Sequence, residues 1–173
     1  MDTGTRTVVF GGKPHPLAGH ELKTGDKAPA FELQANDMSE IDLSMSKGKV
    51  RLLSVVVSLD TPVCDLQTQW FEEEASKYKN VVIYAISMDL PFAQARYCGA
   101  HNIRNLKTLS DHLQASFGRA YGVLISDLRL LSRAIFIIDT NNYIRYVEYI
   151  PDTSHQPDYD KAIDALKTVA AAA

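Results

Sequence analysis

Residues 51–87, RLLSVVVSLDTPVCDLQTQWFEEEASKYKNVVIYAIS, contain two short apolar runs on either side of one amphipathic segment. The runs Arg51–Val57 and Val81–Ser87 are rich in β-branched residues, which is typical of strands buried on both faces of a sheet. Between them, Cys64–Tyr78 carries apolar residues at helical spacing. This order predicts a β-α-β unit whose two strands are parallel and joined by a right-handed crossover.

The segments on either side of this unit predict further strands and helices. Turn-forming residues separate Thr7–Phe10 from His15–Leu22, and Ala134–Asp139 from Tyr143–Tyr149, so each of these two pairs predicts a β-hairpin. The expected strands are Thr7–Phe10, His15–Leu22, Ala30–Gln34, Leu106–Leu109, Ala134–Asp139 and Tyr143–Tyr149, and the expected helices are Asp89–Cys98, closed by Gly99, and Tyr159–Val169.

Parallel strands followed by an antiparallel hairpin and a last helix have the connectivity of a thioredoxin-like fold. We therefore predict an α/β protein, a three-layer α/β/α sandwich with a mixed sheet. The length of 173 residues predicts one domain over residues 1–173, with residues 1–23 as an N-terminal β-hairpin extension. Such a fold supports many activities, so it does not by itself define the function.

The composition excludes several classes of protein. A net charge of −3 argues against a surface that binds polyanions. The most basic segments, Lys47–Arg51 and Arg129–Arg133, are interrupted by apolar residues, which argues against nucleic-acid binding. No apolar run approaches the roughly 18–20 residues of a membrane span. Residues Met1–Arg6 lack the pattern of a secretory signal, so we expect a cytoplasmic protein.

The two cysteines, Cys64 and Cys98, are the residues most suited to chemistry. They are too few for a disulfide scaffold and do not form a CxxC pair. In a reducing cytoplasm, a disulfide between them is expected to be catalytic rather than structural.

Cys64 follows a helix-start signal. Threonine is a preferred N-cap and proline is favoured at the first helical position, so Thr61 and Pro62 place Cys64 at the third position. There, free backbone N–H groups and the helix dipole favour a thiolate, and the Thr61 hydroxyl can reach the sulfur. Asp60 and Asp65 oppose this, because their charges would raise the thiol pKa. A nearby cation is therefore needed, and the pattern alone does not choose among Arg51, Arg96, Arg129 and Arg133.

Cys98 has the opposite setting, because it is expected near the C-terminus of a helix that Gly99 closes. The negative end of the helix dipole leaves the pKa of a thiol there normal or raised. This asymmetry suits a pair in which one thiol is oxidised to sulfenic acid and the other condenses with it. The alternative is that the two residues are unrelated buried thiols.

Three segments resemble a known family. Ser58–Cys64, SLDTPVC, resembles the active-site segment of the thiol peroxidases, an atypical two-cysteine branch of the peroxiredoxins in the thioredoxin-like superfamily. Ser87–Ala100 resembles the segment with that branch's resolving cysteine, and Leu131–Asp139 resembles its arginine-bearing strand. The likeness runs from about Thr24 to the last helix. Two cysteine segments in this order form a specific signal.

The resemblance implies a role for four residues. Cys64 would be the peroxidatic cysteine and Cys98 the resolving one, Thr61 would hydrogen-bond the thiolate and the peroxide, and Arg133 would stabilise the thiolate and orient the peroxide. It implies an antioxidant peroxidase that reduces hydrogen peroxide and organic hydroperoxides through an intramolecular Cys64–Cys98 disulfide. Thioredoxin would be the reductant, and the enzyme would be a homodimer that needs no cofactor.

Two positions depart from the pattern of that branch. Val57 stands where peroxiredoxins usually carry a proline that would shape the loop and shield the sulfur. A valine can instead extend the preceding strand by one residue. Trp70 stands where the branch more often carries a basic residue, and we interpret it as a helix-surface or interface aromatic.

Three other functions remain open from the sequence. A thioredoxin-like disulfide reductase is disfavoured by the missing CxxC pair. A redox-sensing thiol switch without high turnover would use the same disulfide, and a one-cysteine peroxidase would leave Cys98 idle. No metal, haem or flavin is required, and the histidines show no ligand spacing relative to the cysteines: His15, His20, His101, His112 and His155.

Overall fold

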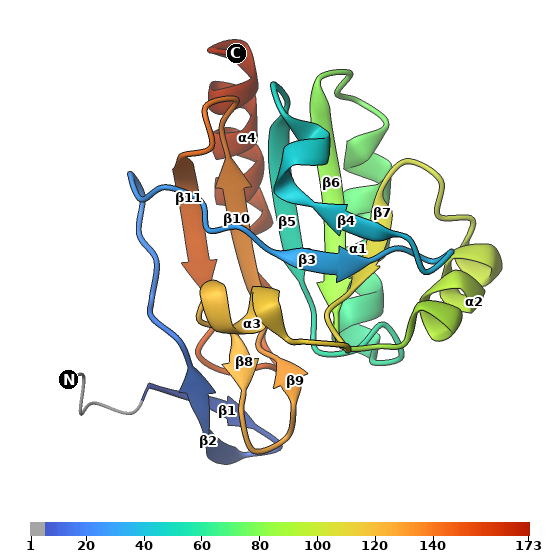
Figure 1. Cartoon of the computed structure of the whole chain (residues 1–173), viewed down its shortest axis with the longest axis vertical. Helices are drawn as coiled ribbons and strands as arrows, with labels where there is room; N and C mark the ends of the chain where they lie inside the picture. The colour runs from blue at the N-terminus through green and yellow to red at the C-terminus, as the bar shows by residue number, and fades with distance from the viewer. Residues whose placement is uncertain (1–5) are drawn as a thin grey trace.

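The computed structural model describes residues 6–173 (Figure 1). Residues 1–5, which belong to the segment discussed above as lacking a signal pattern, lie outside the described residues. The helices are η1 (Leu43–Ser46, 3-10), α1 (Pro62–Ala75), α2 (Pro91–His101), α3 (Ser116–Ala120) and α4 (Tyr159–Ala171). The strands are β1 (Thr7–Phe10), β2 (Lys13–Ala18), β3 (Glu32–Gln34), β4 (Glu40–Asp42), β5 (Val50–Val55), β6 (Val81–Ser87), β7 (Lys107–Ser110), β8 (Leu124–Ile125), β9 (Leu130–Leu131), β10 (Ala134–Ile138) and β11 (Ile144–Tyr149).

A mixed seven-stranded sheet with the order β11-β10-β5-β6-β7-β3-β4 crosses the centre of the molecule (Figure 1). The strands β5, β6 and β7 are parallel, which confirms the predicted β-α-β unit. β10 and β11 form the predicted antiparallel hairpin, and β10 also pairs antiparallel with β5. Because β10 runs opposite to β5, the start of β10 lies at the same edge of the sheet as the end of β5.

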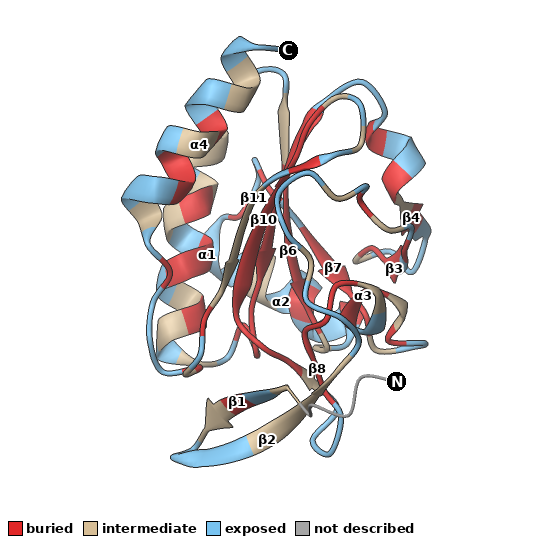
Figure 2. Ribbon diagram, turned by 90° about the vertical axis from the view of Figure 1, so that its left-hand side faces the viewer, coloured by how far each residue is buried: buried red, intermediate tan, exposed pale blue. Residues whose placement is uncertain are grey.

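The central strands are buried on both faces, because their successive side chains point alternately into two apolar clusters. On β5, Leu53 and Val55 join one cluster with Phe117 of α3, whereas Leu52 joins the other with Phe71 of α1. Helices α1 and α4 cover one face of the sheet, and α3 lies on the opposite side (Figure 2). This arrangement confirms the predicted thioredoxin-like, three-layer architecture.

The N-terminal hairpin β1–β2 is also confirmed, and it joins β8 and β9 in a second, four-stranded sheet. The chain packs closely beside it at Gly122, whose φ is +69° and where an added Cβ would lie 2.2 Å from the His20 carbonyl oxygen. Only glycine fits this left-handed, crowded position without a backbone shift. The Arg6 guanidinium donates to the Gly122 carbonyl at 2.9 Å. The contacts of Arg6 and His20 with Gly122 therefore hold both ends of the hairpin against the rest of the chain.

Three details differ from the expectations drawn from the sequence. Gly99 does not close α2, since the helix continues to His101 and ends at Asn102, whose φ is +54°. Asparagine tolerates this left-handed conformation, so it replaces the glycine expected as the terminator. The strand β5 ends at Val55 and does not extend to Val57. The short elements β4, η1, α3, β8 and β9 were not predicted, because two to five residues show too little periodicity.

Candidate active site

Cys64 lies at the start of α1, directly beyond the end of the central strand β5. Thr61 is the N-cap with an extended φ of −115°, and Pro62 follows in the first helical position. This confirms the predicted third helical position of Cys64. The Cys64 side chain is fully buried. The first amides of the helix, including those of Val63 and Cys64, have no intrahelical acceptor, so they are suited to stabilise an anion beside the sulfur.

The Thr61 side chain does not cap the helix. Its hydroxyl donates to the Ser58 carbonyl at 3.0 Å, and no side-chain cap bond is formed. The hydroxyl proton is therefore directed into the loop, which leaves the oxygen with lone pairs as an acceptor. The predicted hydrogen bond from Thr61 to the sulfur requires this hydroxyl to rotate when the thiolate or the peroxide is present.

Arg133 immediately precedes β10, whose first residue Ala134 pairs with Val55 of β5. The antiparallel register therefore brings Arg133 to the edge of the sheet where α1 begins. The Arg133 side chain is 1% exposed, and Nη1 donates to Gln67 Oε1 at 2.8 Å while Nη2 donates to the Thr153 carbonyl at 2.7 Å. Both acceptors are neutral. A buried guanidinium held only by neutral acceptors favours an anion nearby.

Gln67 aims this arginine and was not singled out by the sequence. It lies three residues after Cys64 on the same face of α1, is fully buried, and its Nε2 donates to Ser54 Oγ at 2.7 Å. The donor contact with β5 fixes the amide so that its oxygen faces Arg133. The signal for this role was a polar residue on the apolar face of an amphipathic helix.

Tyr159, at the start of α4, interacts electrostatically with both the Arg133 guanidinium and the Cys64 thiol. Burial raises its pKa to about 12, the Arg133 guanidinium lowers it and the Cys64 thiol raises it. The Tyr159 hydroxyl is buried and has no hydrogen-bond partner among the described residues. Its ring packs against Trp70 with centroids 4.6 Å apart and the two ring planes tilted by 35°, so Trp70 is packed between α1 and α4 rather than lying on an open helix surface.

The other three arginines considered above lie elsewhere. Arg51 is fully buried at the start of β5, where Nη1 donates to the Lys49 and Asp139 carbonyls. Arg96 is exposed on α2, and Arg129 is exposed and donates to the His112 carbonyl. Only Arg133 combines burial with a position at the carboxyl end of β5.

Cys98 lies in the last turn of α2 and is partly buried. Its Sγ is 3.3 Å from Thr108 Oγ1 on β7 and accepts from Asn36 Nδ2 at 3.7 Å. Both cysteines are free thiols, and they belong to different apolar clusters. The position near the helix C-terminus agrees with the prediction, although the helix ends three residues later than expected.

Asp89 anchors the loop before Cys64 and was missed in the sequence. Its Oδ1 accepts from Ser58 Oγ at 2.8 Å, and its Oδ2 accepts from the Leu59 amide at 2.8 Å and from Ser87 Oγ at 2.7 Å. The carboxylate therefore ties the loop to the end of the neighbouring strand β6. An acidic residue two positions after the end of a buried parallel strand was the available signal.

A small apolar cluster surrounds the Cys64 side chain. It contains the buried residues Val56, Val57 and Leu59, and Phe10 from the N-terminal hairpin packs against it. The expectation that Val57 extends β5 is wrong, because Val57 is 4% exposed and lies in the loop, where it fills space around the sulfur. The hairpin thus contributes directly to the shielding of the thiol.

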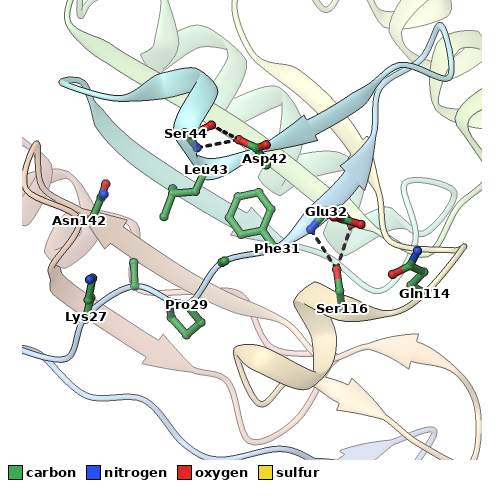
Figure 3. A pocket seen from close by; sticks show the side chains of 12 residues that line it. Lys27, Pro29, Phe31, Glu32, Asp42, Leu43, Ser44, Gln114, Ser116 and Asn142 are labelled. Carbon is green, nitrogen blue, oxygen red and sulfur yellow. Dashed lines mark hydrogen bonds between the residues drawn. The ribbon is translucent and has the colours of Figure 1, made fainter.

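Two surface pockets within residues 6–173 are candidates for substrate access. One of about 460 Å³ lies between the loop before Cys64 and α2, and its lining includes Leu59, Asp89 and Tyr97. A wider one of about 880 Å³ lies between the β3–η1 segment and α3, with Phe31, Leu43 and Ser116 in its wall (Figure 3). Neither cysteine lines either pocket, but the smaller pocket is bordered by Ser58–Asp60 of the loop before Cys64 and by Tyr97 next to Cys98, so it is the candidate route for a substrate.

A thioredoxin-like fold with a buried cysteine at a helix N-terminus, a buried arginine beside that helix and a second free cysteine defines a thiol-dependent oxidoreductase. The Redoxin family model matches residues 23–163. The chain is 53% identical over 93% of its length to the thiol peroxidase of Halalkalibacterium halodurans and covers 97% of that protein. It is 49% identical over 94% of its length to the thiol peroxidase of Bacillus subtilis, again covering 97%.

A solved structure of a peroxiredoxin-like protein from Aquifex aeolicus superposes with a TM-score of 0.89 at 38% identity, covering 95% of this chain and 97% of that one. The chain therefore belongs to the Redoxin family, as a peroxiredoxin-type thiol peroxidase with an antioxidant function. No helix within residues 6–173 is long and apolar enough to cross a membrane.

Proposed function

We propose that Cys64 is the peroxidatic cysteine, Cys98 the resolving cysteine, and Thr61 and Arg133 the groups that orient the peroxide. The observation that carries this assignment is the buried Cys64 thiol in the first turn of α1, together with the buried Arg133 hydrogen-bonded to Gln67 three residues further along the same helix. Both a helix N-terminus and a guanidinium stabilise negative charge. They therefore favour the thiolate, which is the reactive nucleophile.

In the first step the Cys64 thiolate attacks the terminal oxygen of a hydroperoxide. An S–O bond forms, the O–O bond breaks, and the leaving oxygen departs with a proton as water or an alcohol. Cys64 is oxidised by two electrons to the sulfenic acid. The Arg133 guanidinium and the first amides of α1 face the oxygens that gain charge, and such fixed donors lower the barrier.

In the second step the Cys98 sulfur attacks the Cys64 sulfur. An S–S bond forms, the S–O bond breaks, and the hydroxyl leaves as water with the proton from Cys98. A disulfide requires Cα atoms within roughly 7 Å and a defined torsion. Because the two thiols pack in different clusters, this step requires a local rearrangement around α1 and α2.

The family supports a peroxide as substrate and a thioredoxin-like protein as reductant. We propose thioredoxin itself, acting by thiol–disulfide exchange in the cytoplasm, where such reductants maintain thiols. We also propose a homodimer, supported by the family and by exposed apolar side chains on α1 and at the start of α2. These are Leu66 at 56% exposed, Leu90 at 52% and Phe92 at 70%.

The test is peroxide consumption with thioredoxin, thioredoxin reductase and NADPH, using hydrogen peroxide and cumene hydroperoxide. We expect turnover by the native chain, none by Cys64→Ser, and a single turnover by Cys98→Ser. Sustained turnover by Cys98→Ser would support the one-cysteine alternative. A disulfide that forms without turnover in the native chain would support the redox-switch alternative.

A further inference from the structure

The two cysteine-bearing helices are joined by a hydrogen bond between the residues next to the cysteines. Tyr97, which precedes Cys98 on α2, donates its hydroxyl to Oδ1 of Asp65, which follows Cys64 on α1, at 2.6 Å. The same hydroxyl lies 3.5 Å from the Asp65 backbone carbonyl. A contact one residue away from each sulfur restrains the relative motion of the two thiols more directly than contacts farther along either helix.

The state of both groups makes this bond a strong one. Burial opposes the charge on Asp65, but hydrogen bonds from Tyr97 and Gln69 and the charge of His101 outweigh it and hold the Asp65 pKa below its ordinary value. Burial and the Asp65 carboxylate raise the Tyr97 pKa. Tyr97 therefore remains a donor and Asp65 an ionised acceptor near neutral pH. Charge-assisted hydrogen bonds are about twice as strong as neutral ones.

The Tyr97 ring packs against the apolar clusters of both cysteines, the cluster that contains Cys64 and the cluster that Cys98 adjoins. His101, one turn further along α2, stacks on the ring with centroids 4.3 Å apart, and its Nδ1 is 3.8 Å from Asp65 Oδ1. The ring is thus held on one side by the cysteine clusters and on the other by His101.

We propose that Tyr97 and Asp65 form a latch that keeps the first turn of α1 folded while Cys64 reacts with peroxide, and that must open before Cys98 attacks the sulfenic acid. This inference rests on the proposed roles of Cys64 and Cys98. Tyr97 and Asp65 are positioning residues, because they act through the backbone that carries the sulfurs. The chemical step is unchanged: the S–S bond forms, the S–O bond breaks and water leaves.

The latch also sets how readily a second peroxide inactivates the enzyme. While it is closed, the Cys64 sulfenic acid persists and can react with another peroxide to give the sulfinic acid. Opening the latch leads to the disulfide instead. Weakening it should therefore speed disulfide formation and reduce sulfinic acid formation at high peroxide.

Single-mixing stopped-flow fluorescence can follow the step, because Trp70 is the one tryptophan in the sequence and lies on α1 six residues after Cys64. The variants are Tyr97→Phe, which removes only the hydroxyl, and Asp65→Asn, which removes the charge. Gln69→Ala is the matched control. Gln69 donates to the same Asp65 oxygen at 2.7 Å from the same helix, and its Nε2 also lies 3.5 Å from His101 Nδ1 on α2. Its loss removes these two contacts but keeps the Tyr97–Asp65 bond that joins the two helices.

We expect both latch variants to form the disulfide about tenfold faster than the native chain after one equivalent of peroxide, the factor for losing one charge-assisted bond. At excess peroxide, mass spectrometry should show severalfold less Cys64 sulfinic acid in both variants. Gln69→Ala should match the native chain in both measurements. If Tyr97 and Asp65 only stabilise the fold, their variants should lose thermal stability. They should not form the disulfide faster and the sulfinic acid less.

The proposal is overturned if Tyr97→Phe and Asp65→Asn form the disulfide at the native rate or more slowly. It is also overturned if Gln69→Ala accelerates the step as much as they do. Failure of the proposed function gives a different result, since the native chain would then form no Cys64–Cys98 disulfide after peroxide. Thermal unfolding of each variant checks that it is folded at the assay temperature.

Discussion

Removing the charge of Asp89 tests whether the loop before Cys64 must be anchored for the peroxidase reaction. The carboxylate accepts three hydrogen bonds, two from the loop residues Ser58 and Leu59 and one from Ser87. Leu59 is 4% exposed, so water cannot readily replace the carboxylate at its amide. The anchor is therefore internal to the protein and its loss is not compensated by solvent.

The expected cost can be worked out for two variants. A hydrogen bond to an ionised group contributes about 1.5–3 kcal/mol and a neutral one about 0.5–1.5 kcal/mol. Asp89→Asn can keep all three contacts, with its oxygen toward Leu59 and its amide toward Ser58, but without charge. We expect the free energy of unfolding to fall by about 2–3 kcal/mol. Asp89→Ala leaves the Leu59 amide unpaired and should cost about 4 kcal/mol or more.

Urea unfolding measures the stability, and stopped-flow mixing measures the second-order rate of Cys64 oxidation. If the anchor positions the sulfur, that rate falls by up to roughly thirtyfold in Asp89→Asn, the factor for 2 kcal/mol. Asp127→Asn is the control, because it makes the same charge change at a carboxylate that is 46% exposed and whose side-chain hydrogen bond in the described structure is to His15. Native stability and rate in Asp89→Asn, or equal losses in Asp127→Asn, would refute the reasoning.

Three further outcomes follow from the site and the core. Arg133→Met should slow peroxide reduction at pH 7 by about a hundredfold or more, and a native rate in a coupled assay would remove Arg133 from the mechanism. Val57→Pro should speed Cys64 oxidation severalfold, because proline restricts the loop that shields the sulfur; an unchanged or slower rate in the same stopped-flow assay would contradict this. Burial raises the Asp111 pKa from 3.8 to about 6, so its neutral form stabilises the fold below about pH 4, and that contribution is lost as the pH rises through 6. Urea unfolding should show the native chain losing about 3 kcal/mol relative to Asp111→Asn between pH 4 and pH 7, and equal pH slopes would contradict the assignment.

Local sequence patterns correctly predicted the elements that depend on residues only a few positions apart in the chain. The β-branched runs predicted β5 and β6, and the helical spacing between them predicted α1. Thr61 and Pro62 alone predicted that Cys64 lies in the third position of a helix, because N-cap and first-turn preferences act within a few residues. The same reasoning misplaced the end of α2, because asparagine as well as glycine can adopt the left-handed terminator.

Contacts between distant residues were decided only by the tertiary structure. Arg133 reaches α1 because β10 pairs antiparallel with β5, a register that no local pattern encodes. Asp89 meets the Leu59 amide because parallel strands end at one edge of the sheet. Tyr97 meets Asp65 because the C-terminal half of α2 lies beside the first turn of α1. The amino-acid sequence thus determined the helix position of Cys64, the proposed nucleophile, from short-range preferences. The groups proposed to orient, anchor and latch it depend on packing between elements, since their partners lie about 30 to 70 residues away along the chain.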